Sequence, residues 1–250
     1  MQAIQQTDGS LVEIFSSIQG EGPLVGFRQV FIRLSGCNLD CRYCDTDFQA
    51  TLDCRVETIP GSGQIDLWRN PVSLERVLEI LDQYTTAYPQ LHHSISLTGG
   101  EPLASLALLK SWLPGLKSKL PIHLETNGTL HQELGEVIAD IDLISMDFKL
   151  ESVCGVATPW DDHLRFLQTA GDKLLCAKLV VSPLSSVEEI EHAARIMNEA
   201  CATADLILQP MTSPDETITA QQLFKRQECA AKIYRSVRII PQTHRMLNLL

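Results

Sequence analysis

The sequence lacks the features that mark membrane, secreted and nucleic-acid-binding proteins. It has no run of 18 apolar residues, and residues 1–10 lack the apolar stretch of a signal peptide. It also has no basic stripe, no long block of like charge and no low-complexity segment. These absences argue against a membrane span, export and nucleic-acid binding. We therefore expect a cytoplasmic protein with no membrane or nucleic-acid partner.

No internal repeat and no linker divides the chain. Hydrophobic residues make up 44% of the 250 residues and the formal net charge is -11, a composition typical of a soluble globular protein. Because α/β barrels reach this length as one unit, we expect a single domain over residues 1–250. The net charge gives no clue to the substrate.

Three of the eight cysteines, Cys37, Cys41 and Cys44, lie in one short stretch, within the loop 35–48. A [4Fe–4S] cluster needs four ligands and usually takes thiolates, so three cysteines leave one iron open to bind something else. The alternative is a zinc knot that recruits Cys54 or a distant histidine. The remaining cysteines are expected to be buried thiols rather than disulfides; these are Cys54, Cys154, Cys176, Cys201 and Cys229.

Strands and helices alternate along most of the chain, which predicts a parallel α/β sheet. Expected strands are 11–15, 29–34, 94–97, 122–124, 141–146, 174–181, 206–208 and 237–240. Expected helices are 73–84, 103–112, 131–139, 161–170, 187–201 and 220–234. Residues 47–71 show little periodicity, and we expect an irregular insertion there.

Polar residues follow strand after strand of this pattern. Because the carboxyl ends of strands in a parallel barrel build the active site, this recurrence predicts one pocket, although each residue alone also fits a helix cap or a turn. The glycine pair Gly99-Gly100 would let a ligand approach the backbone, and Glu101 can accept from an ammonium group. The polar positions are 98–101, 125–128, Asp147, Lys149, Ser182, Gln209, Gln242 and His244.

The spacing Cys37-x3-Cys41-x2-Cys44, joined to Thr98-Gly99-Gly100-Glu101-Pro102, resembles the radical S-adenosylmethionine (SAM) superfamily. The resemblance implies an incomplete (βα) barrel with about six core parallel strands. It also implies a [4Fe–4S] cluster whose open iron binds SAM and cleaves it to a 5′-deoxyadenosyl radical, so that the cofactor carries the radical chemistry. The SAM-binding positions that it implies are Gly100, Glu101, Glu125, Asp147, Phe148, Lys149, Gln209, Pro210, Met211 and Thr212.

Within the superfamily, segments 15–22, 31–33, 44–46 and 241–244 resemble the 7-carboxy-7-deazaguanine synthase family. That resemblance implies a lyase that contracts the ring of 6-carboxy-5,6,7,8-tetrahydropterin to 7-carboxy-7-deazaguanine with release of ammonia, in queuosine biosynthesis. It further implies a homodimer, an electron donor such as flavodoxin or ferredoxin, and a Mg²⁺ ion held by Thr46. The implied substrate contacts are Ile18, Gln19, Gly20, Glu21, Arg33, Thr98, His244 and the carboxylate of Leu250.

The sequence also fits other interpretations. The loop with Gln19 and Glu21 also fits a plain hairpin turn, and Thr46 a simple turn cap. The apolar C-terminal residues 246–250 could pack on a helix or a dimer partner instead of entering the pocket. A glycyl-radical activase would keep the cysteines and Gly99-Gly100-Glu101 without needing residues 19–22, and an electron carrier or zinc module would bind no SAM.

Overall fold

The computed structural model describes residues 8–42, 44, 51–200, 203–212, 217–247 and 249. Within these residues ten strands form one sheet in the order β10-β9-β8-β7-β6-β5-β2-β1-β3-β4. The strands are β1 (Leu11–Ile18), β2 (Arg28–Leu34), β3 (Asp53–Glu57), β4 (Ile65–Arg69), β5 (Ser94–Gly99), β6 (Ile122–Thr126), β7 (Leu143–Phe148), β8 (Leu174–Val181), β9 (Asp205–Pro210) and β10 (Val237–Ile239).

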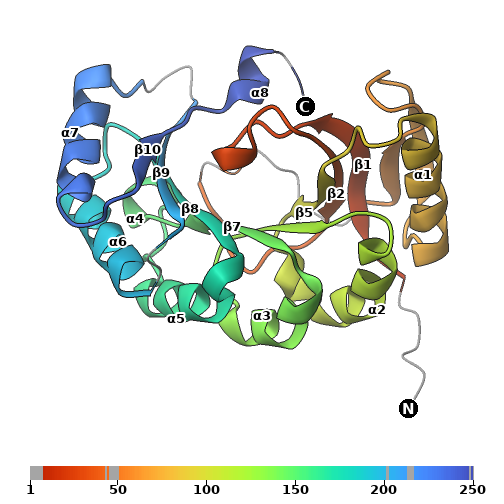
Figure 1. Cartoon of the computed structure of the whole chain (residues 1–250), viewed down its shortest axis with the longest axis horizontal. Helices are drawn as coiled ribbons and strands as arrows, with labels where there is room; N and C mark the ends of the chain where they lie inside the picture. Colours follow the sequence, from red (N-terminus) through yellow and green to blue (C-terminus); the bar gives the residue numbers. More distant parts are fainter. Residues whose placement is uncertain are drawn as a thin grey trace.

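Seven neighbouring strands of this sheet run parallel, namely β2, β5, β6, β7, β8, β9 and β10. Strand β1 pairs antiparallel with β2. Figure 1 shows the sheet curling around a central hollow, with the helices on its outer side. In the described part of the chain the end strands β10 and β4 do not pair with each other, so the barrel is open. The predicted incomplete (βα) barrel is confirmed; its parallel run has one strand more than the expected six or so.

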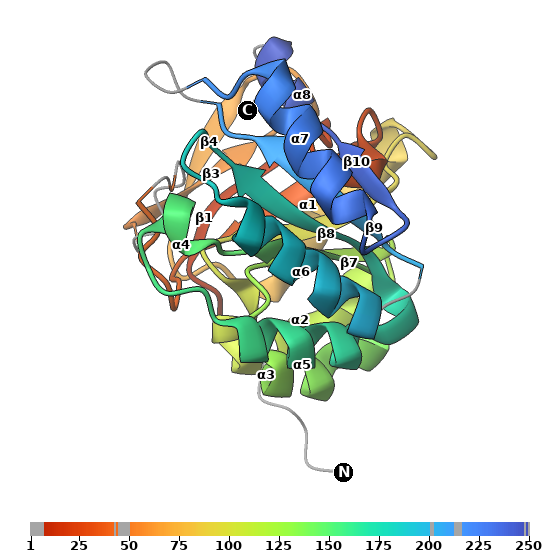
Figure 2. The ribbon, with the colours of Figure 1, turned by 90° about the vertical axis from the view of Figure 1, so that its left-hand side faces the viewer.

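Each long helix packs its apolar face on the outside of the curved sheet. Figure 2 shows α6 and α7 lying over β8, β9 and β10. Ser73 caps α1 by accepting a hydrogen bond from the amide of Arg76, as its position before the apolar periodicity predicts. The helices are α1 (Leu74–Ala87), α2 (Leu106–Lys117), α3 (His131–Val137), α4 (Glu151–Cys154), α5 (Trp160–Ala170), α6 (Val187–Ala200), α7 (Ala220–Ala231) and α8 (Thr243–Met246), with short 3-10 turns η1 (Gly22–Leu24), η2 (Pro102–Ser105), η3 (Ile138–Asp140) and η4 (Gly171–Lys173).

Side chains alternate across the parallel strands, and this alternation separates core from hollow. Leu124, Ile144 and Leu179 face the helices and are fully buried. Their neighbours Glu125 and Lys178 face the hollow and line the cavity inside it. On β6, β7 and β8 the outward-facing side chains are therefore mostly apolar, and the inward-facing ones include the polar residues of the cavity.

The prediction of an irregular insertion at 47–71 is wrong for the part that the structure describes. Strands β3 and β4 form an antiparallel hairpin, and β3 pairs in parallel with β1 at the edge of the sheet. Cys54 and Val56 are buried in the core, whereas Leu67 on the outer strand is 66% exposed. The strands are only five residues long and a glycine-rich turn separates them, so no clear alternation marks them in the sequence.

The loop between β1 and β2 lies inside the hollow rather than outside the sheet (Figure 1). Its 3-10 turn η1 packs against β8. Gly22 has a φ of +65°, and a Cβ there would lie 3.2 Å from Cys176 Sγ on β8. The segment is a hairpin connection, as one reading of the sequence predicts, and it also lines the cavity.

The end of β5 packs directly on the start of the cysteine loop. The amide of Gly100 donates to Leu34 O at 3.1 Å, and the amide of Glu101 donates to Gly36 O at 2.8 Å. A Cβ on Gly100 would lie 1.8 Å from Gly36 O. On this side the chain's own backbone, from Leu34 to Gly36, lies against the glycine pair. The sequence pattern had predicted that a ligand would approach there.

We expect Gly100→Ala to lower the free energy of unfolding by about 2 kcal/mol or more, since backbone must move to make room. Urea denaturation of the anaerobic protein measures this loss. Gly135→Ala in α3 is the matched control, because its Cβ would meet nothing nearer than Thr169 Cγ2 at 4.0 Å. Equal denaturation midpoints for the two variants would contradict the expectation.

Candidate functional site

One cavity of about 1040 Å³ occupies the hollow of the barrel. The cysteine loop, the β1–β2 loop, the carboxyl ends of the parallel strands and the C-terminal segment all contribute to its wall. The polar residues that follow the strands gather there, as the sequence pattern predicts. They include Thr98, Gly99, Gly100, Glu125, Thr126, Asn127, Asp147, Lys149, Ser182, Gln209, Gln242 and His244.

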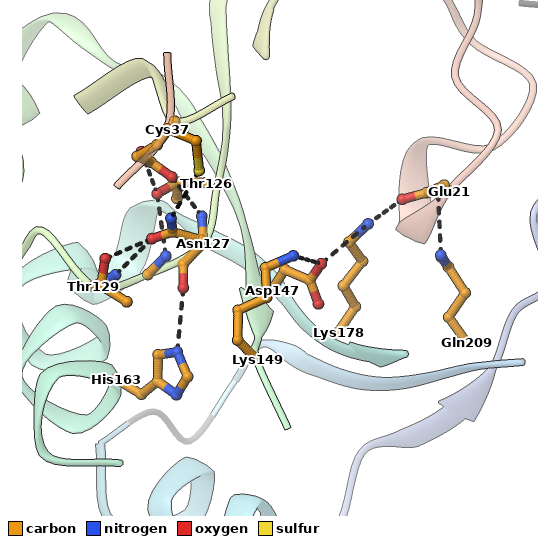
Figure 3. Close-up of polar contacts among 12 residues, drawn as sticks. Glu21, Cys37, Thr126, Asn127, Thr129, Asp147, Lys149, His163, Lys178 and Gln209 are labelled. Carbon is orange, nitrogen blue, oxygen red and sulfur yellow. Dashed lines mark hydrogen bonds and ion pairs between the residues drawn. The ribbon is translucent and has the colours of Figure 1, made fainter. Parts of the chain in front are cut away.

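Cys37, Cys41 and Cys44 all line this cavity. Asn127, directly after β6, holds the cysteine loop: its Nδ2 donates to Asn38 Oδ1 at 2.8 Å and lies 4.0 Å from Cys37 Sγ (Figure 3). The carbonyl of Asn127 in turn accepts from Nε2 of the buried His163 at 3.2 Å. The loop is thus tied through Asn127 to the helical layer.

A further thiol, that of Cys154 in α4, lies beside Cys41. It donates a hydrogen bond to the Cys41 sulfur, which lowers the pKa of Cys41 to about 7 although burial opposes the shift. The same bond, with burial, raises the pKa of Cys154 well above its usual range. In this pair Cys154 is therefore the hydrogen-bond donor and Cys41 the acceptor.

The other described cysteines are free and buried, as predicted. Cys54 is fully buried in the core on β3, and burial raises its pKa to about 12. It does not line the cavity. The zinc-knot reading with Cys54 as fourth ligand therefore finds no support, whereas three thiols around one cavity fit a [4Fe–4S] cluster with an open iron.

Seven of the ten predicted SAM positions line the cavity: Gly100, Glu125, Asp147, Lys149, Gln209, Met211 and Thr212. Pro210 and Phe148 do not. Because side chains alternate along β7, Asp147 points inward and Phe148 points outward. The centre of the Phe148 ring lies 5.0 Å from that of the His163 ring and 6.2 Å from that of the Trp160 ring. A contact from Phe148 to a ligand would therefore use its backbone.

Glu101, the remaining SAM position, lies behind the cavity wall and is fully buried. Its Oε1 accepts from Leu103 N and Thr126 Oγ1, and its Oε2 from Asn127 N at 2.7 Å. Burial raises the pKa of Glu101 to about 6 in spite of these donors. The carboxyl joins the β5 and β6 ends that surround the cysteine loop.

Glu21 of the β1–β2 loop gathers partners from three other parts of the barrel. Its Oε1 accepts from Gln209 Nε2 at 3.0 Å and Gln242 Nε2 at 2.8 Å, and its Oε2 accepts from Lys178 Nζ. Burial alone would raise the pKa of Glu21, but Lys178, with help from Gln242 and His244, lowers it to about 2. Figure 3 shows this ionised carboxylate joined to Lys178 and Gln209.

The side chain of Gln19, like that of Glu21, makes three hydrogen bonds. Its Nε2 donates to Glu125 Oε1 and to Gln29 Oε1, both at 3.0 Å, and its Oε1 accepts from the amide of Glu21 at 3.0 Å. The predicted substrate contacts Gln19 and Glu21 and the predicted SAM contact Glu125 therefore belong to one hydrogen-bonded network.

Arg33 lies near the carboxyl end of β2 and also lines the cavity. Its Nε donates to Glu13 Oε1 at 2.8 Å, and its guanidinium carbon is 5.9 Å from the centre of the Phe15 ring, which stacks on Phe31. The salt bridge to Glu13 and the contact with the Phe15 ring together hold the guanidinium group in place. Arg33 therefore presents a fixed cation that is suited to binding a carboxylate.

Of the other predicted substrate contacts, Ile18, Gly20, Thr98 and His244 line the cavity. A Cβ on Gly20 would lie 2.0 Å from His244 Nδ1, so the C-terminal segment packs directly on the β1–β2 loop. Leu249 also lines the cavity. Thr46, Cys201 and Leu250 lie outside the described residues.

Sequence reasoning missed Lys178, Glu13 and Gln29. Lys178 carried a usable signal, because it is the one charged residue in the otherwise apolar strand 174–181. Glu13 and Gln29 alternate with buried apolar residues in β1 and β2, where the pattern is that of a strand with one solvated face.

Comparisons with known proteins agree with the geometry of the site. A family model described as the radical SAM superfamily matches residues 31–197. A 7-carboxy-7-deazaguanine synthase of Geobacter sulfurreducens is 44% identical over 241 residues, which cover 95% of this chain and 96% of that protein. The chain belongs to the 7-carboxy-7-deazaguanine synthase family of the radical SAM superfamily.

Another enzyme of that family, from Thermococcus kodakarensis, is 32% identical over 257 residues, covering 96% of this chain and 98% of that protein. Among solved structures, QueE from Escherichia coli has a TM-score of 0.57 at 20% identity and covers 95% of each chain. SuiB from Streptococcus suis bound to S-adenosylmethionine has a TM-score of 0.51 at 16% identity and covers 81% of this chain and 44% of that one. These two likenesses show the shared fold.

Membership of the superfamily implies a [4Fe–4S] cluster and SAM. The thiols of Cys37, Cys41 and Cys44 fit the first group, and the polar cavity beside them fits the second. No helix among the described residues is long and apolar enough to cross a membrane.

We expect Cys37→Ala, Cys41→Ala and Cys44→Ala each to lose most of the bound iron after anaerobic reconstitution, because each removes one of three ligands. Cys54→Ala should keep its iron, since that thiol is buried away from the cavity. Iron per protein chain and the visible spectrum measure both effects. Iron loss from Cys54→Ala equal to that from Cys41→Ala would mean that a fourth thiolate closes the site.

We also expect the stability of the protein to fall as the pH decreases from about 6.5 to about 4. Burial lowers the pKa of His163 to about 4, so the ring stays neutral in the folded protein but takes up a proton on unfolding. The unfolded chain then binds more protons below about pH 6.5, which favours unfolding. In His163→Gln the free energy of unfolding, measured in urea, should change less over this range; an unchanged slope would contradict the assignment.

Proposed function

We propose that this protein is a radical SAM lyase that contracts 6-carboxy-5,6,7,8-tetrahydropterin to 7-carboxy-7-deazaguanine with release of ammonia. The observation that carries the proposal is the meeting of three features around one cavity: the cysteine loop, the Gln19-Gly20-Glu21 loop and the Gln242 to His244 segment. A general radical SAM site needs only the first. The other two features fit the named reaction, a step of queuosine biosynthesis.

When bound, the cluster and SAM would supply an electron and a 5′-deoxyadenosyl radical. Cys37, Cys41 and Cys44 would hold the cluster, and the polar strand ends from β5 to β9 would hold SAM. What the rest of the chain must do is bind and orient the pterin and exclude water. The residues at the β1–β2 side of the cavity are suited to that task.

Two parts of the cavity complement opposite ends of the substrate. Arg33, fixed by Glu13, presents a cation suited to the substrate carboxylate. Glu21, ionised and fixed by its partners, presents an acceptor to the N–H groups of the pterin. Opposite charges at the two ends would set the direction in which the substrate lies.

The predicted roles of Thr46 and Leu250 stay proposals that rest on the family. Thr46 would hold a Mg²⁺ ion beside the substrate carboxylate, where the ion could polarise it. The terminal carboxylate of Leu250 would accept from the aminopyrimidinone edge of the pterin. A homodimer, a flavodoxin or ferredoxin as electron donor, and a cytoplasmic location likewise remain predictions.

The proposed function is tested by anaerobic incubation with SAM, dithionite, Mg²⁺ and 6-carboxy-5,6,7,8-tetrahydropterin, followed by mass analysis. We expect 7-carboxy-7-deazaguanine, with ammonia released in equal amount. Cleavage of SAM to 5′-deoxyadenosine with the pterin unchanged would point instead to another radical SAM reaction, such as activation of a glycyl-radical protein. No cleavage of SAM by cluster-loaded protein would contradict both.

We expect Thr46→Ala to bind its cluster and cleave SAM but to turn over the pterin at least tenfold more slowly, because the substrate carboxylate loses the ion that orients it. Added Mg²⁺ should restore the rate only in part. Initial rates at a series of Mg²⁺ concentrations measure the effect. A wild-type rate that does not depend on the metal would rule out this role.

A further inference from the structure

Lys178 lies in the middle of β8 with its ammonium group in the barrel hollow. Its side chain is 15% exposed and lines the cavity. Burying a cation is unfavourable unless partners compensate the charge, and the other residues of β8 are apolar or uncharged. The partners of Lys178 therefore indicate what it does.

The partners are carboxylates on two different sides of the cavity. Lys178 Nζ donates to Glu21 Oε2 on the β1–β2 loop and lies 3.8 Å from Asp147 Oδ2 on β7. Asp147 has a cation of its own, since Lys149 Nζ lies 2.7 Å from the same oxygen. Figure 3 shows Lys178 between the two acids. Glu21 therefore depends on Lys178 more than Asp147 does.

Among the described residues, the hydrogen bonds of Glu21 leave room for one more donor. Each carboxylate oxygen has two acceptor positions. The side-chain amides of Gln209 and Gln242 use both positions of Oε1. Lys178 uses one position of Oε2. An N–H group that binds Glu21 from the cavity would thus meet Oε2, next to the Lys178 ammonium.

We propose that Lys178 is a positioning residue for the pterin: it holds Glu21 Oε2 at the cavity surface as an ionised acceptor for an N–H group of the substrate. The inference rests on the proposed function, which supplies the substrate class. It adds a residue that acts on the substrate through Glu21. SAM, on the side of Asp147 and Lys149, is bound without the help of Lys178.

Removing Lys178 has a consequence that depends on pH. The groups that face Glu21 are Lys178 from β8, Gln209 from β9, and Gln242 and His244 after β10, with Asp147 beyond Lys178. In Lys178→Met the burial of Glu21 is no longer offset by the ammonium, so its carboxyl pKa rises. A protonated Glu21 would lose its acceptor role at low pH and regain it at high pH.

The test compares wild type, Lys178→Met, Glu21→Gln and the double variant. Lys110→Met is the matched control, because Lys110 forms a surface ion pair with Glu136 outside the cavity. Binding of 6-carboxy-5,6,7,8-tetrahydropterin and of SAM is measured by anaerobic equilibrium dialysis on cluster-loaded protein without reductant, so that no turnover occurs. Thermal unfolding of every variant is recorded alongside.

We expect Lys178→Met to bind the pterin at least tenfold more weakly at pH 6.5 and to recover most of that loss at pH 8.5, with SAM affinity within twofold of wild type. The double variant should bind the pterin no more weakly than Glu21→Gln alone, since Lys178 acts through Glu21. It carries neither charge of the pair, so it keeps the test open where a single variant fails to fold. Lys110→Met should match wild type.

Three outcomes would overturn the inference: pterin binding by Lys178→Met within twofold of wild type at both pH values, wild-type binding by the double variant, or a loss in the double variant equal to the product of the single losses. The second outcome would make the pair merely structural, and the third would place Lys178 itself on the substrate. A wild-type protein that neither binds nor converts the pterin would instead overturn the proposed function, and the inference with it.

Discussion

The structure depends on the pairing of the charged side chains that lie inside the open barrel. The hollow holds ion pairs among Glu21, Asp147, Lys149 and Lys178, and charges taken out of water are stable only when they are paired and hydrogen-bonded. Glu21 meets this requirement by drawing in β8, β9 and the segment after β10. The pairing of one carboxylate therefore fixes the β1–β2 loop against the far wall of the sheet.

The cysteine loop is held in a different way, by hydrogen bonds between backbone segments that lie close together. The amides of Gly100 and Glu101 bond to the chain around Gly36, and Asn127 bonds to Asn38 from the neighbouring strand end. The two halves of the cavity are thus built separately. Glycines and a buried acid hold the cluster side, and an ion pair inside the hollow holds the side proposed for the substrate.

Much of this arrangement could be predicted from sequence, because it rests on periodicity and on local motifs. The β8 bounds 174–181 agree with prediction, and the polar strand ends gather in one cavity as expected. The β3–β4 hairpin could not be predicted, since its short strands share a segment with two glycines and two prolines. Lys178 and Glu13 could not be assigned roles, because their partners lie 157 and 20 positions away. Such pairings become visible only when the sheet is assembled.

The hydrogen bond between Glu21 and Gln242 spans 221 positions of the chain. Proteins are synthesised from the amino terminus, and domains fold as units during or after synthesis. The contact between the cysteine loop and the end of β5 needs no residue beyond 101, whereas the Glu21 network needs Gln242. During translation, the residues that hold the cluster side of the cavity are therefore present well before those that close the side proposed for the substrate.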